Sequence, residues 1–191
     1  MSIQNVMVIG AGQMGSGIAQ VCAQAGLNVK LNDMKQEAYD KGIATITKNL
    51  SRNVEKGRMT EDEKTAVLGR ITSSLDLKDA HDVDIVIEAA VENMAIKHSI
   101  FKTLDEVTPK HTILATNTSS LPITEIAAVT NRPEQVIGMH FMNPVPVMKL
   151  VEIIRGLATS DEVYKKVEEM TVQLSKTPVE VNDFPGFVSN R

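Results

Sequence analysis

A glycine-rich turn near the N-terminus constrains the fold more than any other feature of this sequence. Four apolar residues, 6–9, lead directly into glycines at positions 10, 12 and 15, and apolar residues at helical spacing follow as far as Ala25. This order of strand, glycine turn and helix has the G-x-G-x-x-G spacing, in which the glycines permit a tight turn and close packing of the helix on the strand. The start of such a helix also favours a bound phosphate, because its N–H groups are free. The turn therefore predicts the first half of a βαβ unit.

An acidic residue at the end of the next predicted strand fits the same motif. The strand spans Asn28–Asn32 and ends in Asp33, which follows the last glycine by 18 residues (33 − 15). In dinucleotide-binding domains an acid about 20 residues after the glycines binds the ribose hydroxyls on the adenine side. Because this carboxylate would repel a 2′-phosphate, we predict NAD as the cofactor in preference to NADP. The predicted contacts are Gly10, Ala11, Gly12, Gln13, Met14, Gly15 and Asp33. The alternative is a glycine turn that only packs a βα corner.

Length and composition narrow the class of protein. The chain has 191 residues, of which 42% are hydrophobic, enough to bury the core of one domain. A net charge of −4 and an aromatic content of 3% give no basis for nucleic-acid binding. No apolar run reaches the roughly 18 residues of a membrane span. The single cysteine, Cys22, excludes a disulfide framework. We therefore expect a cytoplasmic protein with a buried thiol that binds neither nucleic acid nor a membrane.

The remainder of the chain alternates between helical and strand patterns. Helical spacing covers residues 35–57, 61–68, 95–107, 122–128 and 161–174. Apolar runs typical of strands cover residues 71–74, 83–89, 112–116, 136–139, 148–154 and 178–181. Thr60 and Glu63 have the spacing of a helix capping box. Because strands and helices alternate without repeats or linkers, we predict an α/β, Rossmann-type doubly wound, mostly parallel sheet with helices on both faces.

Two charged residues follow the strand predicted at 83–89. Glu92 comes just after its carboxyl end, where open α/β sheets bind ligands, so it is a candidate cofactor contact. An acid that only favours the start of the next helix is an equally good interpretation. Lys97 lies early in that helix, where the dipole disfavours a positive charge, which indicates an anionic partner. The apolar face of this helix is predicted to hold Ile96, Ile100, Leu104 and Val107.

A histidine and a glutamate are the candidate catalytic pair. His140 ends one predicted strand, and Glu152 lies on the next, with a proline turn between them. Adjacent strands would bring the two side chains into contact, and the carboxylate would then fix the imidazole tautomer and leave the second nitrogen as a general base. A lone histidine is more often structural, but the partner acid and the strand-end position favour catalysis. The other histidines, His81, His98 and His111, stand at polar boundaries without metal-ligand spacing. We expect them to be solvated and predict no metal site.

Together these motifs resemble the 3-hydroxyacyl-CoA dehydrogenase family. The resemblance rests on four segments: the glycine turn with Gln13-Met14-Gly15, the Asn-Thr-Ser-Ser segment 117–120, the run 140–152 that begins His-Phe-Met-Asn-Pro-Val-Pro, and the ending 185–191. It covers all 191 residues. Within the family, the sequence is most similar to the bacterial members that act on 3-hydroxybutyryl-CoA.

The resemblance implies a reaction and a role for each residue. Hydride is transferred between NAD(H) and C3 of a short-chain 3-hydroxyacyl-CoA or 3-oxoacyl-CoA. His140 acts as the general base for the 3-hydroxyl group and Glu152 orients it. Ser119 hydrogen-bonds the reacting oxygen beside the nicotinamide, and Asn190 binds the substrate's oxygen.

The resemblance also implies contacts to both nucleotides. The residues expected to hold the nicotinamide half of NAD are Glu92, Lys97, Asn117, Ser119 and Asn143. Asn49 and Lys56, together with Ser119, are expected to hold the CoA moiety. The family further implies that the parent enzyme is a homodimer or a higher homo-oligomer.

The resemblance finally implies a domain boundary. The family carries a second, all-helical domain after the position of Asn190. We therefore expect residues 1–184 to form the NAD-binding domain and residues 185–191 to begin a connection to a helical domain that is absent. Such a chain is expected to bind NAD(H) and to turn over acyl-CoA poorly or not at all. The alternative function is a non-catalytic NAD-binding module, which would not explain Ser119, His140, Glu152 and Asn190 together.

Overall fold

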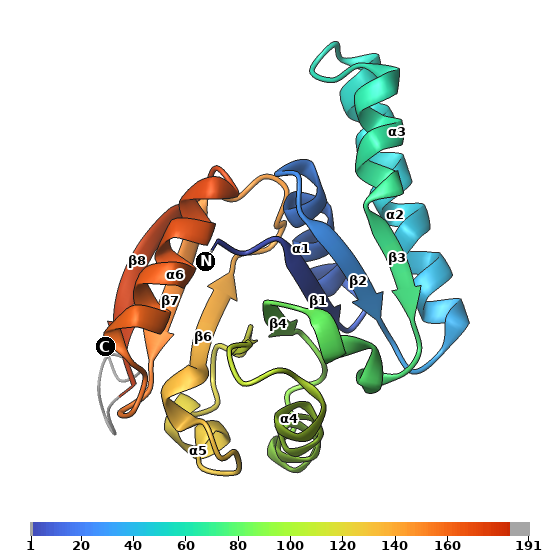
Figure 1. Cartoon of the computed structure of the whole chain (residues 1–191). Helices are drawn as coiled ribbons and strands as arrows, with labels where there is room; N and C mark the ends of the chain where they lie inside the picture. Colours follow the sequence, from blue (N-terminus) through green and yellow to red (C-terminus); the bar gives the residue numbers. More distant parts are fainter. Residues whose placement is uncertain (1, 184–191) are drawn as a thin grey trace.

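One eight-stranded sheet with helices on both faces forms the architecture (Figure 1). The computed structural model describes residues 2–183. The strand order is β3-β2-β1-β4-β5-β6-β7-β8. The strands are β1 (Asn5–Ile9), β2 (Asn28–Asn32), β3 (Ile71–Ser74), β4 (Ile85–Glu88), β5 (Ile113–Thr116), β6 (Val136–Phe141), β7 (Leu150–Arg155) and β8 (Thr177–Asn182). The first six strands run parallel, and β7 reverses direction against β6. The predicted doubly wound, mostly parallel α/β fold is confirmed.

The central strands are buried on both faces because helices cover each side. Successive residues of β1 alternate, so that Val6 and Val8 enter one core cluster while Met7 and Ile9 enter the other. The first face is covered by α1 (Gln13–Gln24), α2 (Gln36–Glu55), α3 (Glu61–Gly69) and α6 (Asp161–Gln173). The second face is covered by α4 (Met94–Val107), α5 (Ile123–Ala127) and the 3₁₀ turn Leu77–Asp82. A second 3₁₀ turn, Pro133–Gln135, leads into β6.

The end of α2 and the start of α3 are marked by the residues that the sequence indicates, Gly57 and the capping box of Thr60 and Glu63. Gly57 adopts φ +72°, a left-handed conformation that favours glycine just after a helix. Thr60 Oγ1 accepts a hydrogen bond from the Glu63 amide, and the Glu63 carboxylate accepts one from the Thr60 amide, so the predicted capping box is present. The two helices pack against each other and extend past the edge strand β3 (Figure 1).

The predicted apolar face of α4 is confirmed for Ile100, Leu104 and Val107, which pack on the core, but not for Ile96. Lys97, Phe101 and Leu104, at spacing i, i+4 and i+7, are fully buried, whereas Ile96 is 43% exposed. The helix is therefore rotated to bring Lys97 under the sheet, at the expense of Ile96. The rotation also affects His98, which is half-buried and whose Nε2 is buried without a hydrogen-bond partner in the part of the chain described. The expectation that His98 is solvated was wrong for this reason.

Cys22 lies inside the core, as predicted. Its side chain is fully buried on α1, and burial raises the pKa of the thiol to about 12. The thiol is therefore protonated at neutral pH and unable to react as a nucleophile. Within residues 2–183, none of the helices combines the length and the apolar character that crossing a membrane requires.

Candidate active site

The glycine turn between β1 and α1 is built by close backbone contacts. Gly10 has φ +100°, and a Cβ there would lie 2.7 Å from the Ala89 carbonyl oxygen. A Cβ on Gly15 would lie 1.6 Å from the Gly10 carbonyl oxygen, so only glycine permits this packing of the helix on the strand. Gly12 differs, because a Cβ there would meet nothing within 4 Å. The backbone at Gly12 is therefore open to an approaching ligand.

Asp33 is tied to this turn by its side chain. Its Oδ2 accepts a hydrogen bond from the Ala11 amide at 2.8 Å, and its Oδ1 accepts one from the Met34 amide at 2.7 Å. The helix that follows the turn has no side-chain cap at its N-terminus, so its first N–H groups remain available. The open backbone and the uncapped helix start offer N–H donors that fit a pyrophosphate, and the half-buried carboxylate of Asp33 is an acceptor that fits the ribose hydroxyls of a dinucleotide.

His140 and Glu152 are hydrogen-bonded across β6 and β7. The two residues are direct partners in the antiparallel register, which places their side chains on the same face of the sheet. His140 Nδ1 lies 3.0 Å from Glu152 Oε1. Their side chains are 20% and 37% exposed, so the pair sits at a partly shielded surface. When the imidazole is neutral, Nδ1 donates to the carboxylate and Nε2 carries the lone pair that can accept a proton.

The segment 117–120 lies beside this pair. Asn117 follows the end of β5, and its Oδ1 accepts a hydrogen bond from the Phe141 amide at 2.8 Å, directly after His140. Asn117 therefore joins the carboxyl ends of β5 and β6. Ser119 is exposed on the same segment, and Asn143 is exposed in the loop that follows β6. The structure thus brings Asn117 close to His140 at the carboxyl ends of β5 and β6.

Glu92 faces this segment from the loop after β4. Its Oε2 accepts hydrogen bonds from Thr118 Oγ1 at 2.6 Å and from Ser120 Oγ at 2.8 Å. Burial alone would raise the pKa of the Glu92 carboxyl, but the two hydroxyl groups and the nearby Lys97 outweigh it and hold the pKa below its usual value. Since α4 is capped by Asn93, Glu92 lies outside the helix and is not an acid of its first turn.

Lys97 has its anionic partner within the chain. Its Nζ lies 2.8 Å and 2.7 Å from the two carboxylate oxygens of Glu88, and both side chains are buried. Thr116 donates from its hydroxyl to the same carboxylate at 2.6 Å. Neither Glu88 nor Thr116 is among the site residues predicted from the sequence. The sequence held only part of the signal: Glu88 is an acid at the end of an apolar strand, and Lys97 is a lysine placed against its helix dipole. Their pairing depends on how α4 packs against the sheet.

The residues expected to hold CoA lie elsewhere, along α2. Asn49 is half-buried, and its Nδ2 donates to Gln20 Oε1 on α1 at 3.1 Å. Lys56 is exposed at the C-terminal end of α2. The structure does not bring either residue into contact with His140. Asn190 and the boundary predicted between residues 184 and 185 lie outside the described residues, so both stay predictions.

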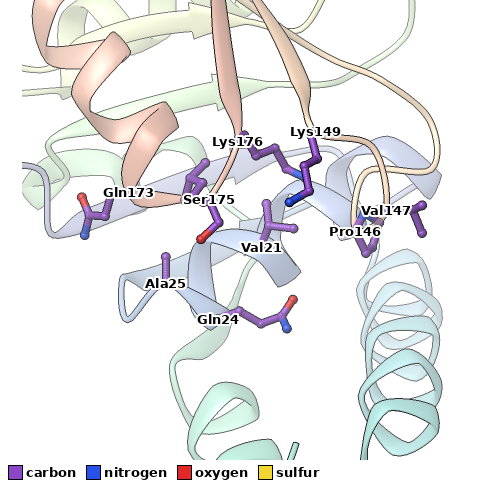
Figure 2. A pocket seen from close by; sticks show the side chains of 10 residues that line it. Val21, Gln24, Ala25, Pro146, Val147, Lys149, Gln173, Ser175 and Lys176 are labelled. Carbon is purple, nitrogen blue, oxygen red and sulfur yellow. The ribbon is translucent and has the colours of Figure 1, made fainter. Parts of the chain in front are cut away.

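A pocket of about 380 Å³ lies away from the predicted site residues, between the C-terminal ends of α1 and α6 and the loop before β7 (Figure 2). Lys176 lines it and donates from Nζ to the carbonyl oxygens of Val145 at 2.7 Å and Met148 at 2.6 Å. Burial, with a smaller effect of Lys149, lowers the pKa of Lys176. This lysine therefore tethers the loop that leads from His140 to Glu152.

Comparisons with known proteins identify the family of the chain. A family model described as the NAD binding domain of 3-hydroxyacyl-CoA dehydrogenase matches residues 5–184. A probable 3-hydroxybutyryl-CoA dehydrogenase of Bacillus subtilis is 62% identical over the whole chain, which spans 67% of that relative. A 3-hydroxybutyryl-CoA dehydrogenase of Clostridioides difficile is 50% identical over 96% of the chain and 66% of the relative.

A solved structure shows the same arrangement of elements. The crystal structure of an (S)-3-hydroxybutyryl-CoA dehydrogenase from Ralstonia eutropha superposes with a TM-score of 0.95 at 50% identity, covering 100% of this chain and 67% of that one. The chain thus spans about two thirds of the length of these relatives. From the family match, the identities and the shared fold, it follows that the chain belongs to the 3-hydroxyacyl-CoA dehydrogenase family, as its NAD-binding domain.

Proposed function

We propose that this chain is the cofactor domain of a dehydrogenase that transfers hydride between NAD(H) and C3 of a short-chain 3-hydroxyacyl-CoA, with 3-hydroxybutyryl-CoA and acetoacetyl-CoA as the pair of substrates. The names of the relatives support this substrate class. The observation that carries the proposal is the 3.0 Å contact between His140 Nδ1 and Glu152 Oε1, because a cofactor-binding module without catalysis has no use for an oriented imidazole at its sheet edge.

Bound NAD supplies the acceptor for the hydride that leaves C3 of the alcohol. The proposed residues for the pyrophosphate and adenine-side ribose are Gly10, Ala11, Gly12, Gln13, Met14, Gly15 and Asp33. The proposed residues for the nicotinamide half are Glu92, Lys97, Asn117, Ser119 and Asn143. Of these, Lys97 would act from beneath the site, since its side chain is buried against Glu88.

The chain's own part in the reaction is to hold and move a proton. His140 Nε2 accepts the proton of the 3-hydroxyl group while Nδ1 keeps its hydrogen bond to Glu152. Glu152 stabilises the imidazolium that forms and prevents the ring from turning. In the direction of reduction, the same nitrogen returns the proton to the ketone oxygen. Ser119 and Asn190 are proposed to hydrogen-bond that oxygen.

Binding of CoA and assembly complete the proposal. Asn49, Lys56 and Ser119 are proposed to contact the CoA moiety, for which the charge of an exposed lysine suits a phosphate group. The whole protein is proposed to work in the cytoplasm as a homodimer or a higher homo-oligomer.

Two proteins test the proposal side by side. The first is the 191-residue chain, and the second is a chimera that joins it to the C-terminal third of the Bacillus subtilis relative. Calorimetry measures NADH binding to both, and the loss of NADH absorbance measures acetoacetyl-CoA reduction. We expect both proteins to bind NADH and the chimera to reduce acetoacetyl-CoA, at a rate that His140→Gln lowers by about 10²–10⁴-fold. NADH binding without turnover in the chimera would instead favour a non-catalytic module.

A further inference from the structure

A buried charge network joins three segments beneath the segment 117–120. Its centre is Glu88, the last residue of β4, whose side chain is 0% exposed. Oε1 accepts hydrogen bonds from Lys97 Nζ at 2.8 Å and Thr116 Oγ1 at 2.6 Å. Oε2 accepts from Lys97 Nζ at 2.7 Å and from the Ala90 amide at 2.7 Å. One carboxylate therefore fixes the end of β5, the first turn of α4 and the loop between β4 and α4.

Lys97 extends the network from the buried Glu88 to the more exposed Glu92. The ammonium group that Glu88 holds also lies 3.5 Å from Glu92 Oε1. Glu92 in turn accepts hydrogen bonds from Thr118 and Ser120, the residues on either side of Ser119. The backbone takes part as well, because the Asn117 amide donates to the Glu88 carbonyl at 2.8 Å. Within the segment 117–120, Asn117 is thus bonded to Glu88 directly, and Thr118 and Ser120 are linked to it through Glu92 and Lys97.

We propose that Glu88 is a positioning residue: by holding the Lys97 ammonium it sets the place of Glu92 and of the segment that carries Ser119. The inference rests on the proposed function, in which Glu92, Asn117 and Ser119 contact the nicotinamide half of NAD. Glu88 itself is buried and touches neither cofactor nor substrate. Its effect on binding passes through Lys97, which has no other carboxylate at such short distance among the described residues.

A gain in folding stability does not by itself account for the buried ion pair of Glu88 and Lys97. Two buried charges lose their hydration, and this loss offsets most of their attraction, so a buried ion pair contributes little net stability. A network that is fully hydrogen-bonded does, however, fix side chains in one arrangement. The four hydrogen bonds that the Glu88 carboxylate accepts, from Lys97, Thr116 and the Ala90 amide, have that effect at the carboxyl ends of β4 and β5, where the site is expected.

A second buried ion pair on the same helix provides a matched control. Asp105 lies near the C-terminal end of α4, and its Oδ1 accepts a hydrogen bond from Arg132 Nε at 2.8 Å with both side chains 9% exposed. Lys97 and Asp105 are eight residues apart, which is about 12 Å along a helix. Asp105→Asn therefore breaks a buried pair on α4 far from the segment 117–120.

The first experiment compares Glu88→Gln with Asp105→Asn in the 191-residue chain. Both variants are expected to lower the melting temperature. Only Glu88→Gln is expected to shift the amide NMR resonances of Thr118, Ser119 and Ser120 and to weaken NADH binding by about tenfold or more, as the loss of charge-assisted hydrogen bonds does. Unchanged NADH affinity in Glu88→Gln, within about twofold, would overturn the inference even if the variant were less stable.

A double-mutant cycle with Lys97→Met tests the route and remains informative if Glu88→Gln alone does not fold. Glu88→Gln with Lys97→Met removes both charges at similar volume, so no buried charge is left unpaired. If Glu88 acts through Lys97, the double variant binds NADH as Lys97→Met does. A further loss of affinity in the double variant would refute this route. A wild-type chain without NADH binding would refute the proposed function together with the inference, whereas equal binding by wild type and Glu88→Gln refutes the inference alone.

Discussion

Asp33 Oδ2 lies 2.8 Å from the Ala11 backbone nitrogen, so the acid at the end of β2 and the glycine turn after β1 form one hydrogen-bonded unit. The carboxylate is thereby fixed at the place where the adenine-side ribose is proposed to bind. Asp33→Ser is expected to shift the ratio of NADPH to NADH affinity toward NADPH by about tenfold or more, because the repulsion between two nearby negative charges is removed. Calorimetric titration of both nucleotides measures the ratio. Asp62→Asn, a loss of charge at an exposed position on α3, should leave it unchanged.

Substitutions at Gly12 and Gly15 distinguish the role of the turn in packing from its proposed role in NAD binding. Gly15→Ala is expected to destabilise the domain by about 3 kcal/mol or more, since its Cβ would lie 1.6 Å from the Gly10 carbonyl oxygen. Gly12→Ala should cost about 1 kcal/mol or less, because its Cβ meets no atom within 4 Å and only the N-cap preference for glycine over alanine is lost. The same methyl group would nevertheless weaken NADH binding, as it occupies the open side of the turn. Denaturant titration with calorimetry separates the two effects, and full NADH affinity in Gly12→Ala would place the cofactor elsewhere.

Substitution of His140 or Glu152 is expected to lower the rate of turnover without weakening NADH binding. In the chimera, His140→Gln should lower the turnover of acetoacetyl-CoA by about 10²–10⁴-fold, the usual contribution of a general acid–base group. NADH affinity should stay near that of the wild type, because His140 is assigned to no cofactor contact. Glu152→Gln should also reduce turnover and change the pH–rate profile, since the ring loses its charged partner. Near-normal turnover in His140→Gln would exclude the proposed mechanism.

Acid sensitivity follows from Asp84. Its Oδ2 accepts hydrogen bonds from the Gln4 and Asn5 amides, each at 2.9 Å. Burial alone would raise the pKa of this carboxyl, but the two amides and His111 outweigh it and lower the pKa. The folded pKa is thus below the unfolded value of about 3.9, so the ionised carboxylate stabilises the fold above about pH 4, and this stabilisation is lost as the pH falls through the folded pKa.

Asp84→Asn should therefore unfold at lower denaturant concentration than wild type at pH 7, and the two stability curves should converge below about pH 4. Urea titrations between pH 7 and pH 2.5 measure the difference. Asp62→Asn is again the control, because its carboxyl is exposed and accepts no backbone hydrogen bond among residues 2–183. A constant difference between Asp84→Asn and wild type across this range would contradict the assignment.

The thiol of Cys22 should not react with thiol reagents while the protein is folded. Its thiol is fully buried and its pKa is raised to about 12 by burial, so neither access nor ionisation permits reaction. We expect no labelling by a colorimetric disulfide reagent at pH 8 until denaturant unfolds the chain, after which one thiol per chain reacts. Rapid labelling without denaturant would show that α1 opens locally.

Features determined by neighbouring residues were predictable from the sequence. The strands β2 and β3 have their predicted bounds, and the capping box of Thr60 and Glu63 is present. The contact between His140 and Glu152 was also predictable, because the two residues lie on consecutive strands joined by one loop. Their catalytic role stays a prediction.

Features that depend on distant parts of the chain were not predictable. The role of Glu88 follows from its register with Thr116 across β4 and β5, and from the rotation of α4 that buries Lys97. Hydrophobic periodicity placed Ile96 on the inner face instead, because it assigns no weight to a buried charge pair. A similar limit applies to β4, which begins at Ile85 since Val83 and Asp84 still belong to the connection from the preceding 3₁₀ turn.

The reversal of β7 against β6 has a consequence for insertions and deletions. Five residue pairs define this ladder, and His140 faces Glu152 in only one of its alignments. Because side chains alternate between faces, a slip of one residue would place Val151 or Ile153 opposite the imidazole and turn the carboxylate to the far side of the sheet. The loop 142–149 can therefore change length only if the ladder keeps its alignment. A variant in which β6 and β7 are misaligned could thus stay folded and still lose the contact between His140 and Glu152.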